Sequence, residues 1–218
     1  METKGEVAGL LLAAGGGRRL GGRPKALLPY GGRPLIEHAV RALRDGGCDA
    51  VHVVLGAAAA DVQERADLAG CVVVENPHWA DGMGSSLRAG LASIASVASL
   101  TASGAVGAAL IGLVDQPGVG AGTVARVLAV ARAADDLPSA LVSAAYGGRR
   151  GHPVLIGAGR WAGVAAGASG DRGARTDLRA HAGQTVLVEC GDIGDPSDID
   201  TPADLRLLDG AARRATES

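Results

Sequence analysis

Continuous apolar runs alternate along this chain with segments whose apolar residues recur every three or four positions. The continuous runs predict strands buried on both faces, and the other spacing predicts helices. Strands are expected near 7–14, 50–56, 71–76, 107–115, 139–145, 151–157 and 185–190, and helices near 34–46, 60–68, 82–99, 121–134, 173–183 and 201–214. The alternation predicts an α/β fold class, a three-layer α/β/α sandwich with a mostly parallel central sheet. We expect one domain over residues 1–218, with its core at about 7–210 and a frayed C-terminal tail.

Residues at the helix ends support two of these boundaries. Pro34 begins and Gly46 ends the first helix, positions at which each residue type is favoured. Ser85 or Ser86 is expected to be the N-cap of the helix within 82–99, because a serine hydroxyl can accept a hydrogen bond from a free backbone N–H of the first turn.

The charge of the chain is nearly balanced, with a formal net charge of −2 at pH 7. This argues against a protein that binds nucleic acid or a membrane surface. Basic residues are nevertheless concentrated in one glycine-rich segment, which contains Arg18, Arg19, Arg23, Lys25 and Arg33. A local cluster in a nearly neutral protein favours a small anionic ligand.

The cysteines and the first residues indicate a cellular compartment. The 3 cysteines are widely spaced and form no C-x-x-C pair, which favours reduced structural thiols over a disulfide framework or a zinc site. Glu2, Lys4 and Glu6 argue against a signal peptide, and the apolar run at 7–14 is too short to span a bilayer. We therefore expect a soluble, cytoplasmic protein.

The glycine-rich segment LLLAAGGGRRLGGRPKALLPYGGRPL, residues 10–35, begins within the first predicted strand. It is not a Walker A loop, because Arg23 and Pro24 follow Gly22 where a lysine and a hydroxyl residue are needed. It is not a dinucleotide fingerprint either, because Leu20 replaces the third glycine. A different kind of phosphate site is required.

Ligands of open α/β sheets bind beyond the carboxyl ends of the strands. The corresponding loops are expected at 15–25, 76–86, 115–118 and 190–200. In the first of them, the glycine N–H groups together with Arg18, Arg19 and Lys25 can cradle a triphosphate. The same groups can neutralise charge that develops during phosphoryl-type transfer.

Aspartates follow two of the predicted strands. Asp115 stands at a strand end that faces the basic loop, a position suited to Mg²⁺, which prefers one or two carboxylates together with phosphate oxygens. In the later acidic loop, residues 190–200, a cap of the last helix would account for one position, most naturally Asp200 or Thr201. A second metal ligand would account for the crowding of carboxylates there. Spacing alone does not choose among Asp192, Asp195, Asp198 and Asp200.

The pattern LAAGGGRRLGGRPKALLPYGGRPLIEHAV, residues 12–40, resembles the signature of the MobA-like nucleotidyltransferases, L-A-A-G-x-G-x-R-(M/L) followed by P-K-x-L. Further matches follow in order: GMGSSLRAGL, VDQPGV, GHPVLIG, GDRGAR and DIDTPADL. The ordered set resembles the molybdenum-cofactor cytidylyltransferase branch and covers residues 7–208. It implies the Rossmann-like fold of the nucleotide-diphospho-sugar transferases.

The resemblance also implies a role for each matching position. Lys25 is the implied catalytic lysine, assisted by Arg18 and Arg19, and Asp115 and Asp200 are the implied Mg²⁺ ligands. The implied nucleotide-binding residues are Leu12, Ala13, Ala14, Gly15, Gly16, Gly17, Gly82, Gly84, Ser85 and Ser86. The candidates for binding the acceptor are His152, Asp171, Arg172 and Arg175, although an ion pair between Asp171 and Arg175 and a loop-holding role for His152 stay open.

The implied reaction is attack by a phosphate oxygen of an acceptor on the α-phosphorus of a nucleoside triphosphate, with release of pyrophosphate. LAAG rather than LAGG resembles the pyrimidine-using branches and favours CTP over GTP. Molybdopterin is the favoured acceptor, and a molybdoenzyme that receives the cofactor is a further candidate partner.

Three alternatives stay open. A related transferase could use GTP or another phosphorylated acceptor, such as a phospholactate or a sugar phosphate. A nicotinamide-dependent dye reductase on the same fold is disfavoured by the missing dinucleotide fingerprint. A non-catalytic carrier of the molybdenum cofactor would not need Lys25, Asp115 or Asp200.

Overall fold

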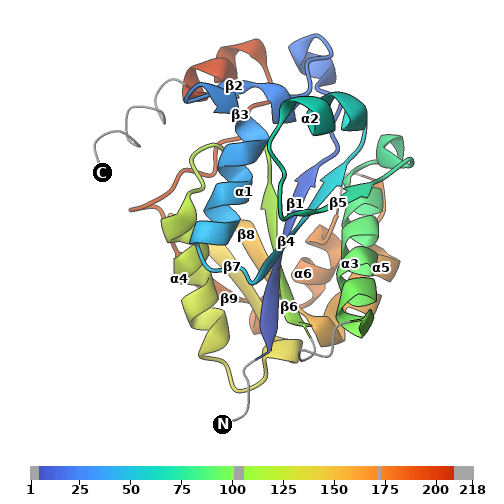
Figure 1. Ribbon diagram of the computed structural model, residues 1–218. Coiled ribbons are helices and arrows are strands. Elements are labelled where there is room, and N and C mark those ends of the chain that lie inside the picture. The colour runs from blue at the N-terminus through green and yellow to red at the C-terminus, as the bar shows by residue number, and fades with distance from the viewer. Residues whose placement is uncertain (1–4, 101–105, 171–172, 209–218) are drawn as a thin grey trace.

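The computed structural model describes residues 5–100, 106–170 and 173–208, and Figure 1 shows its layers. In this part of the chain a seven-stranded sheet has the order β5-β4-β1-β6-β8-β7-β9. Neighbouring strands are parallel except that β8 is antiparallel to β6 and β7, which confirms the mostly parallel sheet. The strands are β1 (Glu6–Ala13), β4 (Ala50–Leu55), β5 (Val72–Glu75), β6 (Val106–Leu113), β7 (Leu141–Tyr146), β8 (Arg149–Gly157) and β9 (Val186–Glu189), with a separate hairpin of β2 (Pro29–Tyr30) and β3 (Arg33–Pro34).

Helices cover both faces of the sheet, so the predicted three-layer sandwich is confirmed (Figure 1). One face packs against α1 (Leu35–Asp45), α2 (Ala59–Arg65) and α4 (Ala121–Arg132), and the other against α3 (Met83–Leu100), α5 (Trp161–Gly167) and α6 (Arg175–Ala180). Among the described helices, none is both long and apolar enough to cross a membrane.

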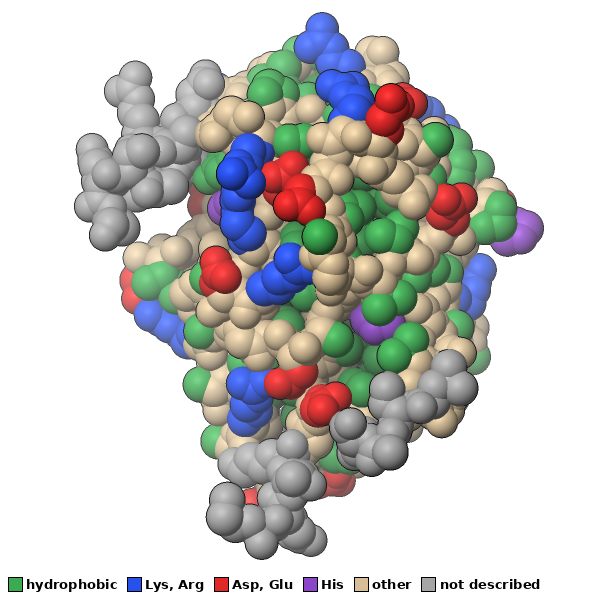
Figure 2. All heavy atoms as spheres, viewed as in Figure 1, with side chains coloured by type: hydrophobic (Ala, Val, Ile, Leu, Met, Phe, Trp, Pro, Cys, Tyr) green, Lys and Arg blue, Asp and Glu red, His purple; other side chains and the backbone are tan. Residues whose placement is uncertain are grey.

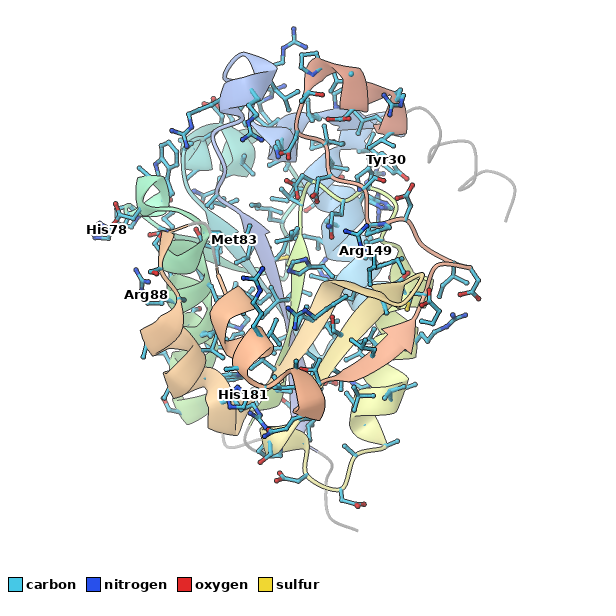
Figure 3. All side chains as sticks on the ribbon, turned by 180° about the vertical axis from the view of Figure 1, so that it is seen from behind. Tyr30, His78, Met83, Arg88, Arg149 and His181 are labelled. Atoms are coloured by element: carbon cyan, nitrogen blue, oxygen red, sulfur yellow. The ribbon has the colours of Figure 1, made fainter. Side chains whose placement is uncertain are left out.

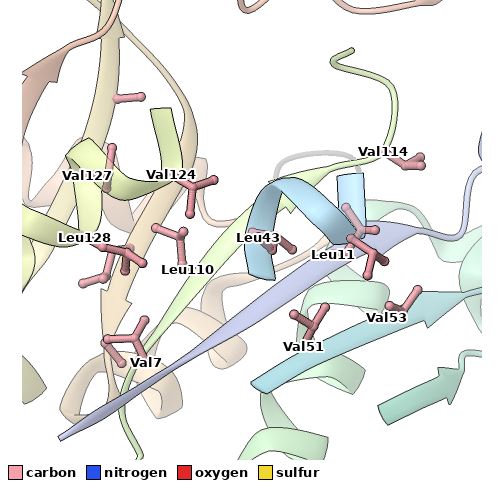
Figure 4. Packing of buried hydrophobic residues seen from close by; sticks show 14 of the residues in the cluster. Val7, Leu11, Leu43, Val51, Val53, Leu110, Val114, Val124, Val127 and Leu128 are labelled. Atoms are coloured by element: carbon pink, nitrogen blue, oxygen red, sulfur yellow. The ribbon is translucent and has the colours of Figure 1, made fainter. Parts of the chain in front are cut away.

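Alternate residues of β1 enter the two layers of the core. Leu11 packs in one cluster with Leu43 of α1 and Val124 of α4 (Figure 4), and Leu10 packs on the opposite face with Leu91 of α3. Leu10 and Leu11 are at most 1% exposed, and full burial of each side chain is worth about 1.5–3 kcal/mol. This burial fixes β1 at the centre of the sheet, and the glycine-rich loop therefore starts from a rigid position.

The structure corrects the predicted N-cap of α3. The helix begins at Met83, so Ser85 and Ser86 lie within its first turn. The residue before it, Gly82, has φ +98° and ψ 178°, a conformation that favours glycine. The Ser85 hydroxyl donates to the carbonyl oxygens of His78 and Gly82, so it ties the preceding loop to the helix.

Other boundaries also differ from the prediction. Strand β8 begins at Arg149, two residues before the expected start, because Gly147 and Gly148 form a tight turn with β7. The helix expected at 173–183 is limited to α6, followed by a 3₁₀ turn at Ala182–Gln184, and the glycine at 183 is a poor helix former. The last helix starts as a 3₁₀ turn at Pro202–Leu205. Its predicted continuation beyond residue 208, like the tail, lies outside the described residues, so the extent of the domain stays a prediction.

Candidate active site

A cleft of about 610 Å³ lies at the carboxyl ends of β1, β5 and β6. Its walls come from the glycine-rich loop after β1, the loop between β5 and α3, and the segments after β6 and β9. On the molecular face in Figure 2, acidic and basic side chains of the described residues are interspersed, without an extended basic area. This arrangement suits a small ligand better than a nucleic-acid strand.

The glycine-rich loop contains a tight turn that only glycine permits. Gly17 has φ +59°, and its carbonyl oxygen accepts a hydrogen bond from the Leu20 N–H. A Cβ atom at residue 17 would lie 1.8 Å from the Arg23 carbonyl oxygen. Leu20 is buried, whereas Arg18 and Arg19, the two central residues of the turn, are exposed and line the cleft. The turn therefore directs the two guanidinium groups outward over the cleft.

Lys25 joins two carboxylates that are far apart in the sequence. Its Nζ donates hydrogen bonds to Asp115 Oδ2 at 2.7 Å and to Asp200 Oδ1 at 2.6 Å, and its side chain is 16% exposed. Burial by itself lowers the pKa of this ammonium, but the charges and hydrogen bonds of Asp115 and Asp200 outweigh burial and raise the pKa above its ordinary value. Lys25 is therefore charged at neutral pH.

The loop between β5 and α3 is held by a buried amide. Asn76 Nδ2 donates to the hydroxyl oxygens of Ser85 and Ser86, at 2.8 and 3.1 Å. Its Oδ1 accepts from the His78 N–H at 3.0 Å. His78 lies at the outer edge of this loop and Met83 lies inward, toward the central strands (Figure 3). These bonds hold the intervening residues, including Trp79, against the cleft.

The segment after β9 presents two aspartates to the cleft. Asp198 and Asp200 both line it, while Ile199 between them is 0% exposed and packs in a cluster with Leu20 and Tyr30. Burial raises the pKa of the Asp198 carboxyl, and the nearby charge of Asp115 raises it further. Asp198 thus joins Asp115 and Asp200 as a third carboxylate on the side of the cleft that contains Lys25.

The donor set fits a divalent cation that also contacts phosphate. The Asp115 and Asp200 carboxylates reach one common cation, the Lys25 ammonium, so both can face one metal ion. Within the described ranges, no three histidine, cysteine or acidic side chains gather closely enough to hold a metal alone. Mg²⁺ is commonly bound by one or two carboxylates and completes its coordination with water and phosphate oxygens, which matches this arrangement.

The structure brings most of the predicted site residues together. Those that line the cleft are Leu12, Ala14, Gly15, Gly16, Arg18, Arg19, Lys25, Gly82, Ser86, Asp115 and Asp200. Ala13 and Ser85 are buried behind it, Gly17 shapes the loop, and Gly84 packs closely against Ala168 and Ser169. Their predicted functional roles stay predictions.

Of the predicted acceptor-binding residues, none that the structure describes lines the cleft. His152 lies at a small separate cavity with Leu11, Leu43 and Gln116. Arg175 begins α6, and its side chain, like Asp171 and Arg172, lies outside the described residues.

Several residues of the site were not selected from the sequence. Asp198 was one of the four acidic candidates but was not chosen. Its position two residues before Asp200 could have indicated it, because residues two apart in an extended segment share a face. Asn76 had no such signal, because its role depends on hydrogen bonds to a helix formed later in the chain. The other residues that line the cleft and were not predicted are Trp79, Ala80, Asp81, Met83, Leu113, Val114 and Gly170.

Comparison with known proteins assigns the chain to a family. Residues 9–186 match the family model of the MobA-like NTP transferase domain. The chain belongs to this family. This confirms the resemblance seen in the sequence and the Rossmann-like fold, and it places the protein with the nucleotidyltransferases.

One similar protein carries a name from another class of enzyme. The nicotine blue oxidoreductase of Paenarthrobacter nicotinovorans is 44% identical over 210 residues, which cover 93% of this chain and 96% of that protein. Among solved structures, a nucleotidyl transferase from Methanothermobacter thermautotroptrophicus (Mth528) is 25% identical with a TM-score of 0.77, covering 96% and 99% of the two chains. Rv0371C from Mycobacterium tuberculosis H37Rv, in complex with manganese, is 28% identical with a TM-score of 0.68, covering 93% and 97%.

Proposed function

We propose that this protein is a Mg²⁺-dependent nucleotidyltransferase that transfers CMP from CTP to the phosphate of molybdopterin. The observation that carries the proposal is the contact of Lys25 with both Asp115 and Asp200 beside the glycine-rich loop, within one cleft. Membership of the MobA-like family and the manganese complex of Rv0371C support a divalent cation at these carboxylates.

Each group of the cleft has a distinct part in this reaction. Backbone N–H groups of Gly15 and Gly16 would bind the triphosphate, and Asp115 and Asp200 would hold Mg²⁺. Bound there, Mg²⁺ would act as a Lewis acid that polarises the phosphate oxygens. Lys25 would stabilise the negative charge that develops on the α-phosphoryl group.

The transfer needs no general base from the protein. An acceptor phosphate oxygen forms a bond to the α-phosphorus, and the bond from this phosphorus to the α–β bridging oxygen breaks, so pyrophosphate leaves. The attacking phosphate monoester is already an anion near neutral pH. CTP is favoured as donor by the LAAG opening of the loop, and molybdopterin is favoured by the ordered set of sequence motifs, with a molybdoenzyme as the candidate recipient of the product.

A second candidate function comes from the similar oxidoreductase. The 44% identity with nicotine blue oxidoreductase extends over nearly the whole of both chains, which favours a nicotinamide-dependent reduction in the same cleft. Leu20 stands where a dinucleotide-binding loop has its third glycine, and this weighs against it. The two candidates differ in the ligands that they require.

Ligand-induced stabilisation separates the two candidates. The melting temperature would be measured with CTP, GTP, ATP, UTP and NADPH, each with and without Mg²⁺, because a ligand that binds only the native state raises stability. Asp115→Asn is the test variant, and Asp135→Asn at an exposed position outside the cleft is the matched control. We expect Mg²⁺-dependent stabilisation by CTP that only Asp115→Asn abolishes, followed by pyrophosphate release when molybdopterin is added. Stabilisation by NADPH alone would refute the transferase proposal and favour the reductase.

A further inference from the structure

Two segments lie side by side next to the cleft, residues 115–118 after β6 and residues 194–200 after β9. The Asp195 N–H donates to the Gly118 carbonyl oxygen at 3.1 Å, and the Ile199 N–H donates to the Asp115 carbonyl oxygen at 2.9 Å. The order of these contacts shows that the segments run antiparallel. Their register decides which side chain of the second segment stands opposite Asp115.

The side chain of Gln116 connects the two segments between these backbone bonds. Its Nε2 donates to the Pro196 carbonyl oxygen at 3.1 Å and to Asp198 Oδ1 at 2.8 Å. Gln116 is only 7% exposed and is not among the residues that line the cleft. It can influence a ligand in the cleft only through the residues that it holds.

The register has a direct consequence for the carboxylates. Residues two apart in an extended segment point to the same side, and Asp198 and Asp200 both face the cleft while Ile199 is buried. A shift of one residue would reverse this pattern, turning Ile199 toward the cleft and the two aspartates away from it. A contact that fixes the register therefore also fixes the charge of the site.

We infer that Gln116 is a positioning residue, whose amide holds the 194–200 segment in the register that brings Asp200 opposite Asp115. The inference rests on the proposed function, because it identifies what sets the geometry of the proposed metal site. Groups that orient metal ligands typically change metal affinity by about 10- to 100-fold when they are removed. Loss of the Gln116 amide is expected to weaken metal binding within this range.

Two substitutions test the amide. Gln116→Met keeps the length of the side chain but removes the donor, and Gln116→Glu keeps its shape but places a carboxylate against Asp198. Gln63→Met is the matched control, because Gln63 is an exposed residue of α2 that does not line the cleft. The full-length protein would be titrated with Mn²⁺ in the presence of α,β-methylene-CTP, which cannot release pyrophosphate, and bound Mn²⁺ would be followed by electron paramagnetic resonance.

We expect the dissociation constant for Mn²⁺ to rise about 10- to 100-fold in Gln116→Met, and further in Gln116→Glu. Gln63→Met should match the wild type. Combining Gln116→Glu with Asp198→Asn restores the hydrogen bond between residues 116 and 198 with donor and acceptor exchanged, but not the donor to the Pro196 carbonyl oxygen. Mn²⁺ binding should therefore recover in part relative to Gln116→Glu alone. A general loss of folding would not be repaired in this way.

The outcomes separate this inference from the proposed function. If the wild type binds Mn²⁺ with the nucleotide analogue and Gln116→Met binds it equally well, the positioning role is wrong and the proposed function stands. Failure of the double variant to recover likewise overturns the role of the Asp198 contact. If the wild type itself shows no nucleotide-dependent Mn²⁺ binding, the proposed function fails and this inference fails with it.

Discussion

Replacing Lys25 with methionine tests the charge arrangement of the cleft. The substitution keeps most of the apolar stem and removes an ammonium that lies 2.7 Å from Asp115 and 2.6 Å from Asp200. A hydrogen bond to a charged group contributes about 1.5–3 kcal/mol when it is protected from water. The bond to Asp200 is worth less, about 0–1 kcal/mol, because the side chain of Asp200 is 45% exposed and screened by solvent.

These values predict that Lys25→Met lowers the free energy of unfolding by about 2 kcal/mol at neutral pH. For a chain of 218 residues, this corresponds to a fall in melting temperature of about 4–8 °C. Urea unfolding would measure the difference directly. Arg126→Met is the control, because Arg126 pairs with Asp192 at a site away from the cleft, and it should change stability much less.

Magnesium should affect the variant and the wild type differently. The Lys25 ammonium lies between the carboxylates of Asp115 and Asp200, so a divalent cation at that position must displace it. In Lys25→Met there is no ammonium to displace and two like charges to neutralise. Added Mg²⁺ is therefore expected to stabilise the variant more than the wild type. Equal stability of the two proteins without Mg²⁺, or an equal gain with it, would refute this account.

The stability difference between the wild type and Lys25→Met should depend on pH, because the pKa of Lys25 is raised. A group whose pKa is higher in the folded than in the unfolded state adds its full contribution to stability below its unfolded pKa, here 10.5. This contribution is lost as the pH rises through the folded pKa. The difference in unfolding free energy between the wild type and Lys25→Met should thus be constant from neutral pH to about 10 and decline only above it.

Three further predictions concern the surroundings of the site. Gly17→Ala should destabilise the fold by more than about 1–2 kcal/mol in urea unfolding, because alanine is strained at positive φ and its Cβ would contact a carbonyl oxygen. Gly15→Ala has open space around the added Cβ, so it should preserve stability and weaken only CTP binding. Asn76→Ala should cost about 1–3 kcal/mol, because two buried serine hydroxyls lose a hydrogen-bond partner. Burial raises the pKa of Cys48 to about 12 and its side chain is partly exposed, so Cys48 should react with Ellman's reagent at pH 8 much more slowly in the native protein than after unfolding. Equally fast reaction of the native and unfolded protein would contradict the raised pKa.

The sequence was informative where structure depends on local pattern. The apolar run of β1 and the spacing of α1 predicted both elements closely, because burial of each depends on residues within the element itself. The caps Pro34 and Gly46 stand where they were expected. The predicted N-cap of α3 was wrong because the serine hydroxyls form hydrogen bonds with Asn76 and, for Ser85, with carbonyl groups of the preceding loop. Such tertiary contacts override local capping preference.

The candidate site was predictable only in part for the same reason. The glycine-rich loop and Asp115 could be recognised because each directly follows a predicted strand. The convergence of Asp200 on Lys25 depends on contacts between residues 175 positions apart, which no local pattern encodes. Only the resemblance to a family selected Asp200 among its acidic neighbours, and it implied no role for Asp198.

The position of Asp200 identifies the segment on which the proposed chemistry depends most. Strand β9 is at the edge of the sheet, separated from β6 by β7 and β8, so the segment after β9 must cross back to reach Asp115. Besides its backbone hydrogen bonds to Asp115 and Gly118, two side chains that do not line the cleft secure it at its destination, the buried Ile199 and the amide of Gln116. Neither belongs to the two large clusters that hold the helices against the sheet. Substitutions in this segment are therefore expected to change the proposed metal site without disturbing the sheet.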